Sequence, residues 1–178
     1  MGEWVLEMTI KLRYGNTNTF LVSGNGGYLL VDTDYAGTLP GFYKVLKVGG
    51  VQLKDISFVL ATHYHPDHMG LIPELMKQGV RLLLGETQMK DVHDSDPIFV
   101  REKSLRFAPI DESEATVISC RESRGFLAGI GIAGEIIPTP SHSRDSVSLI
   151  LDGDCLVGDL EPMEYLSAYV GNPALKAD

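Results

Sequence analysis

Short apolar runs separated by glycine-rich or polar turns dominate the chain, and most of them have the length of a β-strand. The turn signal Gly24-Asn25-Gly26-Gly27 joins two of these runs into a predicted hairpin. We predict strands at Trp4–Leu12, Asn18–Ser23, Tyr28–Asp32, Ile56–Thr62, Val80–Leu84, Thr116–Ser119, Gly129–Pro138, Val147–Leu151 and Cys155–Val157.

Two segments between these strands have a helical pattern. The first helix is predicted at Leu39–Val48, where Gly49 and Gly50 stop it, and the second at Gly70–Gln78, where Gly79 stops it. The stretch Glu86–Glu114 mixes charged residues with prolines, and we expect a helix plus an irregular excursion there. Since helices separate several strands, the pattern predicts a mixed α and β (α+β) domain whose sheets are covered by helices.

The C-terminal segment contains a start signal for a helix that has little chain left to form it. Pro162–Val170 has a helical pattern that Gly171 ends, and Asn172-Pro173 is typical of a new helix start. The five residues that follow are too few for a helix. Two interpretations stand: a frayed end, or a chain shorter than the fold for which its sequence is suited.

Composition and charge narrow the class of protein. With 178 residues, 44% of them hydrophobic and 22% charged, the chain fits one globular domain, residues 1–178. Its 24 acidic residues outnumber 15 basic ones, a net charge of −9, which argues against a nucleic-acid or anionic-membrane partner. Two cysteines exclude a disulfide scaffold, and the N-terminus lacks a signal-peptide pattern, so we predict a cytoplasmic protein.

Three of the five histidines lie within six residues, directly after a predicted buried strand. In extended chain His63, His65 and Asp67 lean to one side, and Pro66 keeps His65 extended. The helix that follows redirects His68 to a neighbouring point. Imidazole and carboxylate side chains around two adjacent points suit Zn, Fe or Mn, and carboxylates bridge two cations. The alternative is a polar surface loop.

A second group of polar residues follows other apolar strands. His142 lies in Thr139-Pro140-Ser141-His142-Ser143, and Gly158-Asp159 follows the last predicted strand. Taken alone, His142 is a loop histidine and Asp159 a turn residue. Their shared position at strand ends, where loops sit on a rigid sheet, favours a common site with His63–His68.

The order of these motifs resembles the metallo-β-lactamase superfamily. The resemblance covers about residues 18 to 165 and rests on four motifs: Asp32-Thr33-Asp34, His63-x-His65-x-Asp67-His68, Pro140-Ser141-His142 and Gly158-Asp159. It implies an αββα sandwich, two mixed sheets packed face to face with helices outside, and a binuclear metal site at the sandwich edge.

The resemblance also implies a role for each motif residue. His63, His65 and His142 would bind a first metal, Asp67 and His68 a second, Asp159 would bridge both, and Asp32 would support the metal loop. Three departures stand out. Ser141 and Asp34 replace frequent glycines, and no histidine follows His142, although the family usually supplies a final histidine to the second metal.

The ligand identities indicate a reaction class. True β-lactamases of this superfamily generally lack the bridging aspartate, so Asp159 argues against them; oxygen-reducing diiron relatives carry Glu where this chain has His65. What remains is similar to glyoxalase II, lactonases and phosphodiesterases. This branch predicts two divalent cations, most simply Zn with Fe or Mn possible, and hydroxide attack on a small-molecule ester, thioester, lactone or phosphodiester. Asp67 is the predicted catalytic residue, orienting the nucleophile and moving its proton.

A non-catalytic reading and several minor candidates remain. Without the final histidine, the domain is a weakly active or non-catalytic metal-binding protein with a weak second site. Exposed apolar surface would then favour a homo-oligomer.

We expect His93 to be solvated, Arg144 to form a surface salt bridge and Cys155 to be an inert core residue. The remaining candidates are tyrosines that could face a cleft and serines without a catalytic base: Tyr14, Tyr35, Tyr64, Ser141, Ser143 and Ser146.

Overall fold

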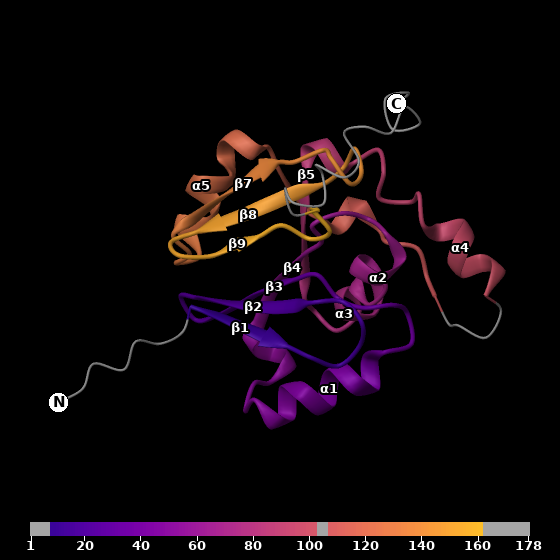
Figure 1. The fold of residues 1–178 in the computed structure, drawn as a ribbon. Helices are drawn as coiled ribbons and strands as arrows, with labels where there is room; N and C mark the ends of the chain where they lie inside the picture. Colours follow the sequence, from indigo (N-terminus) through magenta and orange to yellow (C-terminus); the bar gives the residue numbers. More distant parts are fainter. Residues whose placement is uncertain (1–7, 103–106, 162–178) are drawn as a thin grey trace.

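Six strands form the larger of two sheets in the computed structural model, which describes residues 8–102 and 107–161 (Figure 1). Neighbouring strands follow chain order; β1, β2 and β3 pair antiparallel, whereas β3 to β6 pair parallel. Their bounds are β1 Thr9–Leu12, β2 Thr19–Gly24, β3 Gly27–Val31, β4 Ile56–Leu60, β5 Arg81–Gly85 and β6 Thr116–Ile118.

The smaller sheet has three antiparallel strands in the order β7-β8-β9. They are β7 Gly134–Pro138, β8 Val147–Leu151 and β9 Cys155–Leu156. The backbone N–H of Val147 donates to the carbonyl of Thr62, 2.8 Å away, so the start of β8 lies beside the chain that leaves β4. The smaller sheet therefore meets the larger one at the predicted histidine segment.

Five α-helices and three short 3₁₀-helices connect the strands in the described part of the chain. The α-helices are α1 Leu39–Val48, α2 Pro66–Met69, α3 Ile72–Met76, α4 Asp96–Arg101 and α5 Cys120–Gly129. The 3₁₀-helices are η1 Leu53–Asp55, η2 Glu86–Gln88 and η3 Glu112–Glu114.

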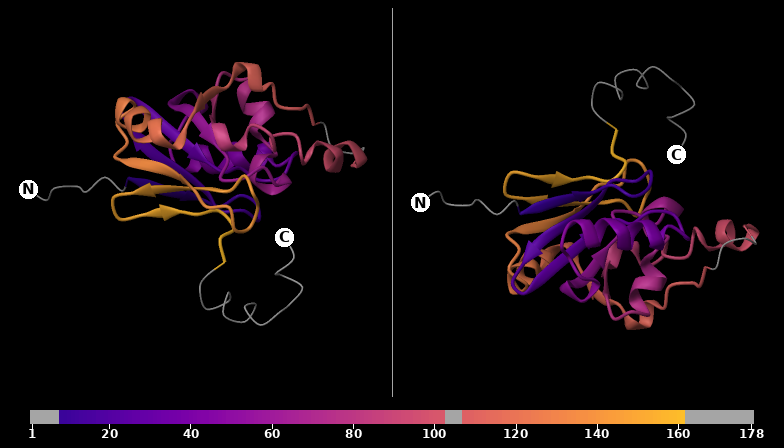
Figure 2. Two further views of the ribbon diagram at one scale, coloured as in Figure 1. Left: turned by 90° about the horizontal axis from the view of Figure 1, so that it is seen from above. Right: turned by 90° about the horizontal axis from the view of Figure 1, so that it is seen from below.

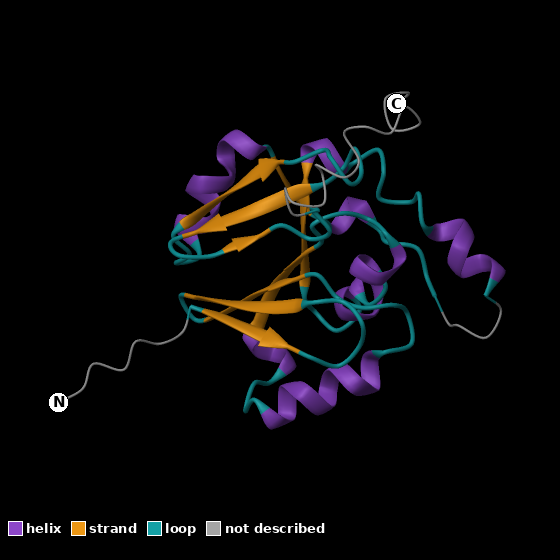
Figure 3. Ribbon diagram, in the orientation of Figure 1, coloured by secondary structure: helices purple, strands orange, loops and turns teal. Residues whose placement is uncertain are grey.

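The alternation of side chains along the strands builds two separate cores. One face of the larger sheet packs against α1 and α3, and the other faces the smaller sheet and α5. The first core contains Leu30, Val59, Leu82, Phe42, Leu46 and Leu75; the second contains Leu29, Phe58, Leu83, Ile136, Leu149 and Leu127. Two packed sheets with helices outside are visible in Figures 2 and 3, and the predicted αββα sandwich is confirmed.

Two predicted elements differ from those observed. The strand predicted at Gly129–Pro138 begins only at Gly134, because α5 occupies Cys120–Gly129. Ser119 and Glu122 form a capping box at the start of this helix, with the Ser119 N–H donating to the Glu122 carboxylate at 3.0 Å.

The helix predicted at Gly70–Gln78 is shorter than expected: α3 covers Ile72–Met76, and a separate short helix, α2, ends just before Gly70. Each has a proline in its first turn, Pro66 in α2 and Pro73 in α3. Gly70 lies between them against another loop, since a Cβ there would stand 2.3 Å from the backbone nitrogen of Ala36. The close approach and the second proline explain the interruption.

Several predictions concern parts of the chain outside the described residues. They are the first residues of the strand Trp4–Leu12, the helix Pro162–Val170 and the helix start at Asn172-Pro173. Within residues 8–102 and 107–161, no helix is both long enough and apolar enough to cross a membrane.

Candidate metal centre

The corner between β4 and α2 holds the histidine motif. His65 is the N-cap of α2, with an extended backbone (φ −70°, ψ 153°), and Pro66 opens the helix. The N–H of His68 then donates to the His65 carbonyl at 3.0 Å, which folds the motif back on itself. His63 and His68 become buried, and their rings lie 4.1 Å apart between centroids.

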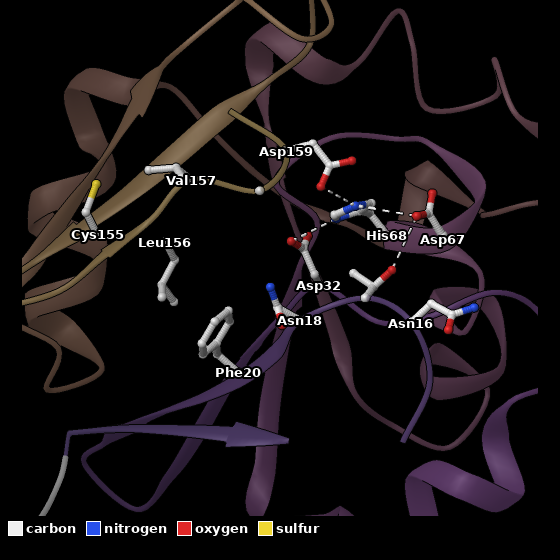
Figure 4. A pocket seen from close by; sticks show the side chains of 12 residues that line it. Asn16, Asn18, Phe20, Asp32, Asp67, His68, Cys155, Leu156, Val157 and Asp159 are labelled. Atoms are coloured by element: carbon white, nitrogen blue, oxygen red, sulfur yellow. Dashed lines mark hydrogen bonds and ion pairs between the residues drawn. The ribbon is translucent and has the colours of Figure 1, made fainter. Parts of the chain in front are cut away.

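Asp32 anchors this corner from the end of β3. It has a φ of +59°, unlike any other non-glycine residue in the described chain, and such strain is typical of functional sites. Its carboxylate accepts the N–H and the hydroxyl of Thr62 at 2.6 and 2.8 Å. The same carboxylate lies 3.0 Å from Nδ1 of His68, so it orients both the end of β4 and the imidazole (Figure 4).

The loops after β7 and β9 bring His142 and Asp159 to the same corner. Nε2 of His142 lies 3.0 Å from Nδ1 of His65. One carboxylate oxygen of Asp159 is 3.2 Å from Nε2 of His68, and the other is 3.7 Å from Nε2 of His142. Asp159 therefore stands between the two sides of the cluster, which suits a bridging ligand.

The ligand atoms fall into two overlapping groups. In each group all three lie within 4.8 Å of one another, and His63 belongs to both: the groups are His63, His65 and His142, and His63, His68 and Asp159. Asp67 belongs to neither. Its Oδ2 lies 3.8 Å from Nε2 of His68 and accepts the hydroxyl of Thr17 at 3.3 Å.

The state of His63 fits a metal ligand. Burial, followed by the neighbouring His68, His65 and His142, lowers the pKa of His63 to about 2, so its imidazole is neutral. Nδ1 lies 3.2 Å from the Thr62 hydroxyl, whereas the buried Nε2 has no hydrogen-bond partner in the described chain. An unpaired nitrogen among imidazoles and carboxylates is the donor set that Zn, Fe and Mn accept, so these residues fit a divalent cation.

His68 differs from His63 in its electrostatics. Burial alone would lower the pKa of His68, but Asp32, with Asp159 and Asp67, outweighs burial and raises it. Three carboxylates thus surround one imidazole, and a cation at this point would replace the proton that they favour.

Gly158 allows Asp159 to reach the cluster. Its φ is +59°, and a Cβ there would lie only 2.4 Å from the hydroxyl oxygen of Thr62. The backbone therefore passes closer to the end of β4 than any side chain would permit.

A pocket of about 230 Å³ opens beside Asp67, His68 and Asp159 (Figure 4). The loop before β2 supplies polar walls, and β2 and the chain at β9 supply apolar ones. Its other lining residues are Asn16, Thr17, Asn18, Phe20, Asp32, Cys155, Leu156, Val157 and Gly158. The pocket reaches the ligand cluster from solvent and is large enough for part of a small substrate.

Two minor candidates lie outside the cluster. Arg144 forms ion pairs with Asp91 and Asp94, the latter at 3.0 Å, as predicted for a surface salt bridge. His93 is partly exposed and lies between the carboxylates of Asp96 and Glu112, at 2.9 and 3.0 Å. Neither residue contributes to the ligand groups.

The three tyrosines do not line the pocket. Tyr64 is buried in the core, the Tyr35 hydroxyl donates to Glu102 at 2.6 Å, and the Tyr14 hydroxyl accepts from Thr19. Ser143 and Ser146 hydrogen-bond to each other, 2.7 Å apart, rather than to a base.

The prediction that Cys155 is a core residue is wrong. Cys155 begins β9 with its side chain exposed, because its neighbour Leu156 faces the core and side chains alternate along a strand.

Two supports of the centre escaped the sequence analysis. The Thr17 hydroxyl reaches Asp67, and the buried amide of Gln88 donates to the carbonyls of Ala61 and Thr62 at 3.0 and 3.3 Å. Neither lies in a recognisable motif, so only their position in the fold reveals them.

The sequence profile of the metallo-β-lactamase superfamily matches residues 12–165. The chain belongs to this superfamily. A probable metallo-hydrolase of Methanocaldococcus jannaschii is 29% identical over 157 residues, which cover 85% of this chain and 71% of the relative. A lactamase-like protein of Aspergillus niger, adaB, is 24% identical and covers 88% of this chain, which spans 55% of that protein.

Solved structures of the superfamily share the fold. A metallo-β-lactamase from Cronobacter sakazakii, a motif mutant, superposes with a TM-score of 0.63 at 19% identity, over 85% of this chain and 60% of that one. A metallo-β-lactamase from Novosphingobium pentaromativorans gives a TM-score of 0.62 at 21% identity, over 94% and 65%. The chain thus spans somewhat less than two thirds of these metallo-β-lactamases.

Proposed function

We propose that this metallo-β-lactamase superfamily member is a metal-dependent hydrolase of a small ester, thioester, lactone or phosphodiester, in the branch similar to glyoxalase II. The observation that carries the proposal is the convergence of four histidines and Asp159 from three separate loops, one of these histidines, His63, having a buried Nε2 without a hydrogen-bond partner in the described chain. The archaeal relative named as a probable metallo-hydrolase supports the same class.

In this proposal His63, His65 and His142 hold one cation, Asp67 and His68 hold a second, and Asp159 reaches both. Bound zinc, iron or manganese would supply Lewis acidity and lower the pKa of water toward neutrality. Since the pocket reaches Asp67, His68 and Asp159 from solvent, a substrate bound there would present its reacting group to these side chains.

Asp67 is the residue proposed to move the proton. Its side chain is 47% exposed and borders the pocket, and the Thr17 hydroxyl fixes one carboxylate oxygen. The carboxylate can accept a proton from attacking water and return it to the leaving group. Asp32 keeps the His68 ring in place during these steps, because its contacts with Thr62 and His68 are buried.

One observation favours a second candidate, a weakly active or non-catalytic metal-binding domain. Asp67 lies outside both compact ligand groups, so the second cation would have fewer close ligands than the first. Metal analysis separates the two candidates: two ions per purified chain support the hydrolase, and one ion supports the binding domain.

The proposal is tested with chromogenic thioester, lactone, carboxylic ester and bis-phosphate substrates. Wild type should hydrolyse at least one of them, lose activity with a chelator and regain it with zinc. His63→Ala should match the chelated protein, while His93→Ala, which removes an imidazole outside the cluster, should keep wild-type activity. Equal rates for wild type and His63→Ala would overturn the metal mechanism.

A further inference from the structure

A buried carboxylate links the two loops that carry the first ligand group. Asp145 follows His142 by three residues, is 4% exposed, and accepts the backbone N–H of Tyr64 at 2.7 Å. Tyr64 stands between His63 and His65. The hydrogen bond therefore joins the loop of His142 directly to the peptide that separates the other two ligands.

The Tyr64 peptide is held on its other side as well. Its carbonyl accepts the buried hydroxyl of Ser95 at 2.5 Å, and the tyrosine ring is buried in the core. Two residues earlier, the Thr62 carbonyl accepts the N–H of Val147. These bonds hold the His63–His65 segment in place. The Asp145 side chain connects the His142 loop to that segment.

Other side chains next to His142 form hydrogen bonds within the loop or to Asp91 and Asp94. Within the loop, the Thr139 N–H donates to the Ser146 carbonyl. The N–H and the hydroxyl of Ser143 both form hydrogen bonds with the Ser146 hydroxyl. Arg144 forms ion pairs with Asp91, which is buried, and with Asp94, which is exposed. Asp145 is thus the buried side chain of this loop that bonds the peptide between His63 and His65.

The hydrogen bond from Tyr64 compensates a buried acidic group, Asp145. No basic side chain forms an ion pair with it in the described chain, and a carboxylate buried without a cationic partner carries a desolvation cost. The Tyr64 N–H offsets part of that cost, which favours the link between the two loops.

We propose that Asp145 is a positioning residue for the group His63, His65 and His142, preorganising it for a divalent cation. The inference rests on the metal binding of the proposed function, not on the hydrolysis. Residues that orient metal ligands typically contribute 10- to 100-fold to metal affinity. We expect a loss in that range, about 10- to 100-fold, for the first equivalent of Zn²⁺ in Asp145→Ala.

Asp34 offers a matched control. It is equally buried, at 2%, and its carboxylate accepts the backbone N–H groups of Asn16 and Tyr35, both at 2.6 Å, without touching the group. Asp34→Ala should lower the resistance of the metal-free protein to urea as Asp145→Ala does, yet leave the first zinc affinity close to wild type. A purely structural role for Asp145 predicts the same zinc affinity in both variants.

The experiment measures Zn²⁺ affinity by competition with a chromophoric chelator, alongside urea unfolding without metal. Asp145→Asn keeps an oxygen that accepts the Tyr64 N–H and should rescue the affinity. If Asp145→Ala does not fold, Asp145→Ser replaces it in the same comparison. Zinc affinity in the Asp145 variant equal to that of Asp34→Ala overturns the inference. Zinc binding without any hydrolysis by wild type overturns only the proposed function, and a wild type that binds no zinc overturns both.

Discussion

Replacing Gly158 with alanine should displace Asp159 from the ligand cluster. The added Cβ would lie 2.4 Å from the Thr62 hydroxyl oxygen and 2.9 Å from the Thr62 Cβ, inside van der Waals contact. Thr62 is itself held by two hydrogen bonds to Asp32, so it cannot move away without breaking them. The chain at Gly158 has to move instead.

Two costs combine in this variant. An alanine in the left-handed region costs about 1–2 kcal/mol, and overpacking of a fixed site typically costs about 1–3 kcal/mol. If the Asp159 loop stays in place, the free energy of unfolding falls by the full amount, about 2–5 kcal/mol. If it moves, stability falls less and the affinity for a cation near Asp159 falls instead.

Gly153, in the turn between β8 and β9, provides the matched control. Its φ of +90° is also positive, but a Cβ there would meet nothing within 4 Å. Gly153→Ala should therefore show the backbone cost, with unchanged metal content. Urea unfolding and metal analysis of both variants separate the cost of the left-handed backbone from the cost of the contact between the new Cβ and Thr62. Identical stability and identical metal content in the two variants would refute the reasoning.

Two further predictions concern a buried and an exposed acidic contact. Asp32→Asn keeps an acceptor for the Thr62 N–H but none for its hydroxyl. It should lower the free energy of unfolding by about 1–3 kcal/mol, and an unchanged urea midpoint would contradict this. Burial is the largest single influence and lowers the pKa of His93, yet the hydrogen bonds that its ring donates to the carboxylates of Asp96 and Glu112, with their charges, together outweigh burial and raise that pKa. Its stabilising effect is then complete below about pH 6.5 and lost as pH rises through the higher folded pKa. Thermal denaturation of wild type and His93→Gln should show a difference in stability that shrinks as pH rises through this folded pKa. A difference that stays constant with pH would show that the contact does not contribute to stability.

The local sequence pattern was sufficient to predict the part of the metal centre that lies in the segment His63–His68. The apolar run before His63 is β4, and Pro66 opens α2 where the extended chain was expected to turn. The alternation of apolar residues also predicted the two-faced sheet, because period-two burial follows directly from strand geometry. The placement of His142 and Asp159 in the same site rested on their shared position at strand ends, and the family resemblance supplied their roles.

Contacts between distant segments were beyond the reach of pattern. Nothing near Asp145 or Gln88 in the sequence indicates that each bonds a backbone group of the histidine loop. Helix α5 was missed because its Gly125 and Gly129 weaken the helical signal, although the Ser119–Glu122 capping box marks its start.

The proposed ligands come from both sheets of the sandwich, so metal supply would govern the lifetime of the folded chain. His63 follows β4 of the larger sheet, whereas His142 and Asp159 follow β7 and β9 of the smaller one. A cation bound by His63 and by His142 or Asp159 would therefore link the two sheets. At a free concentration one hundred times its dissociation constant, such an ion adds about 2.7 kcal/mol to stability. In cells short of that ion, the two sheets would separate more often, and proteases would then cleave the opened chain more readily.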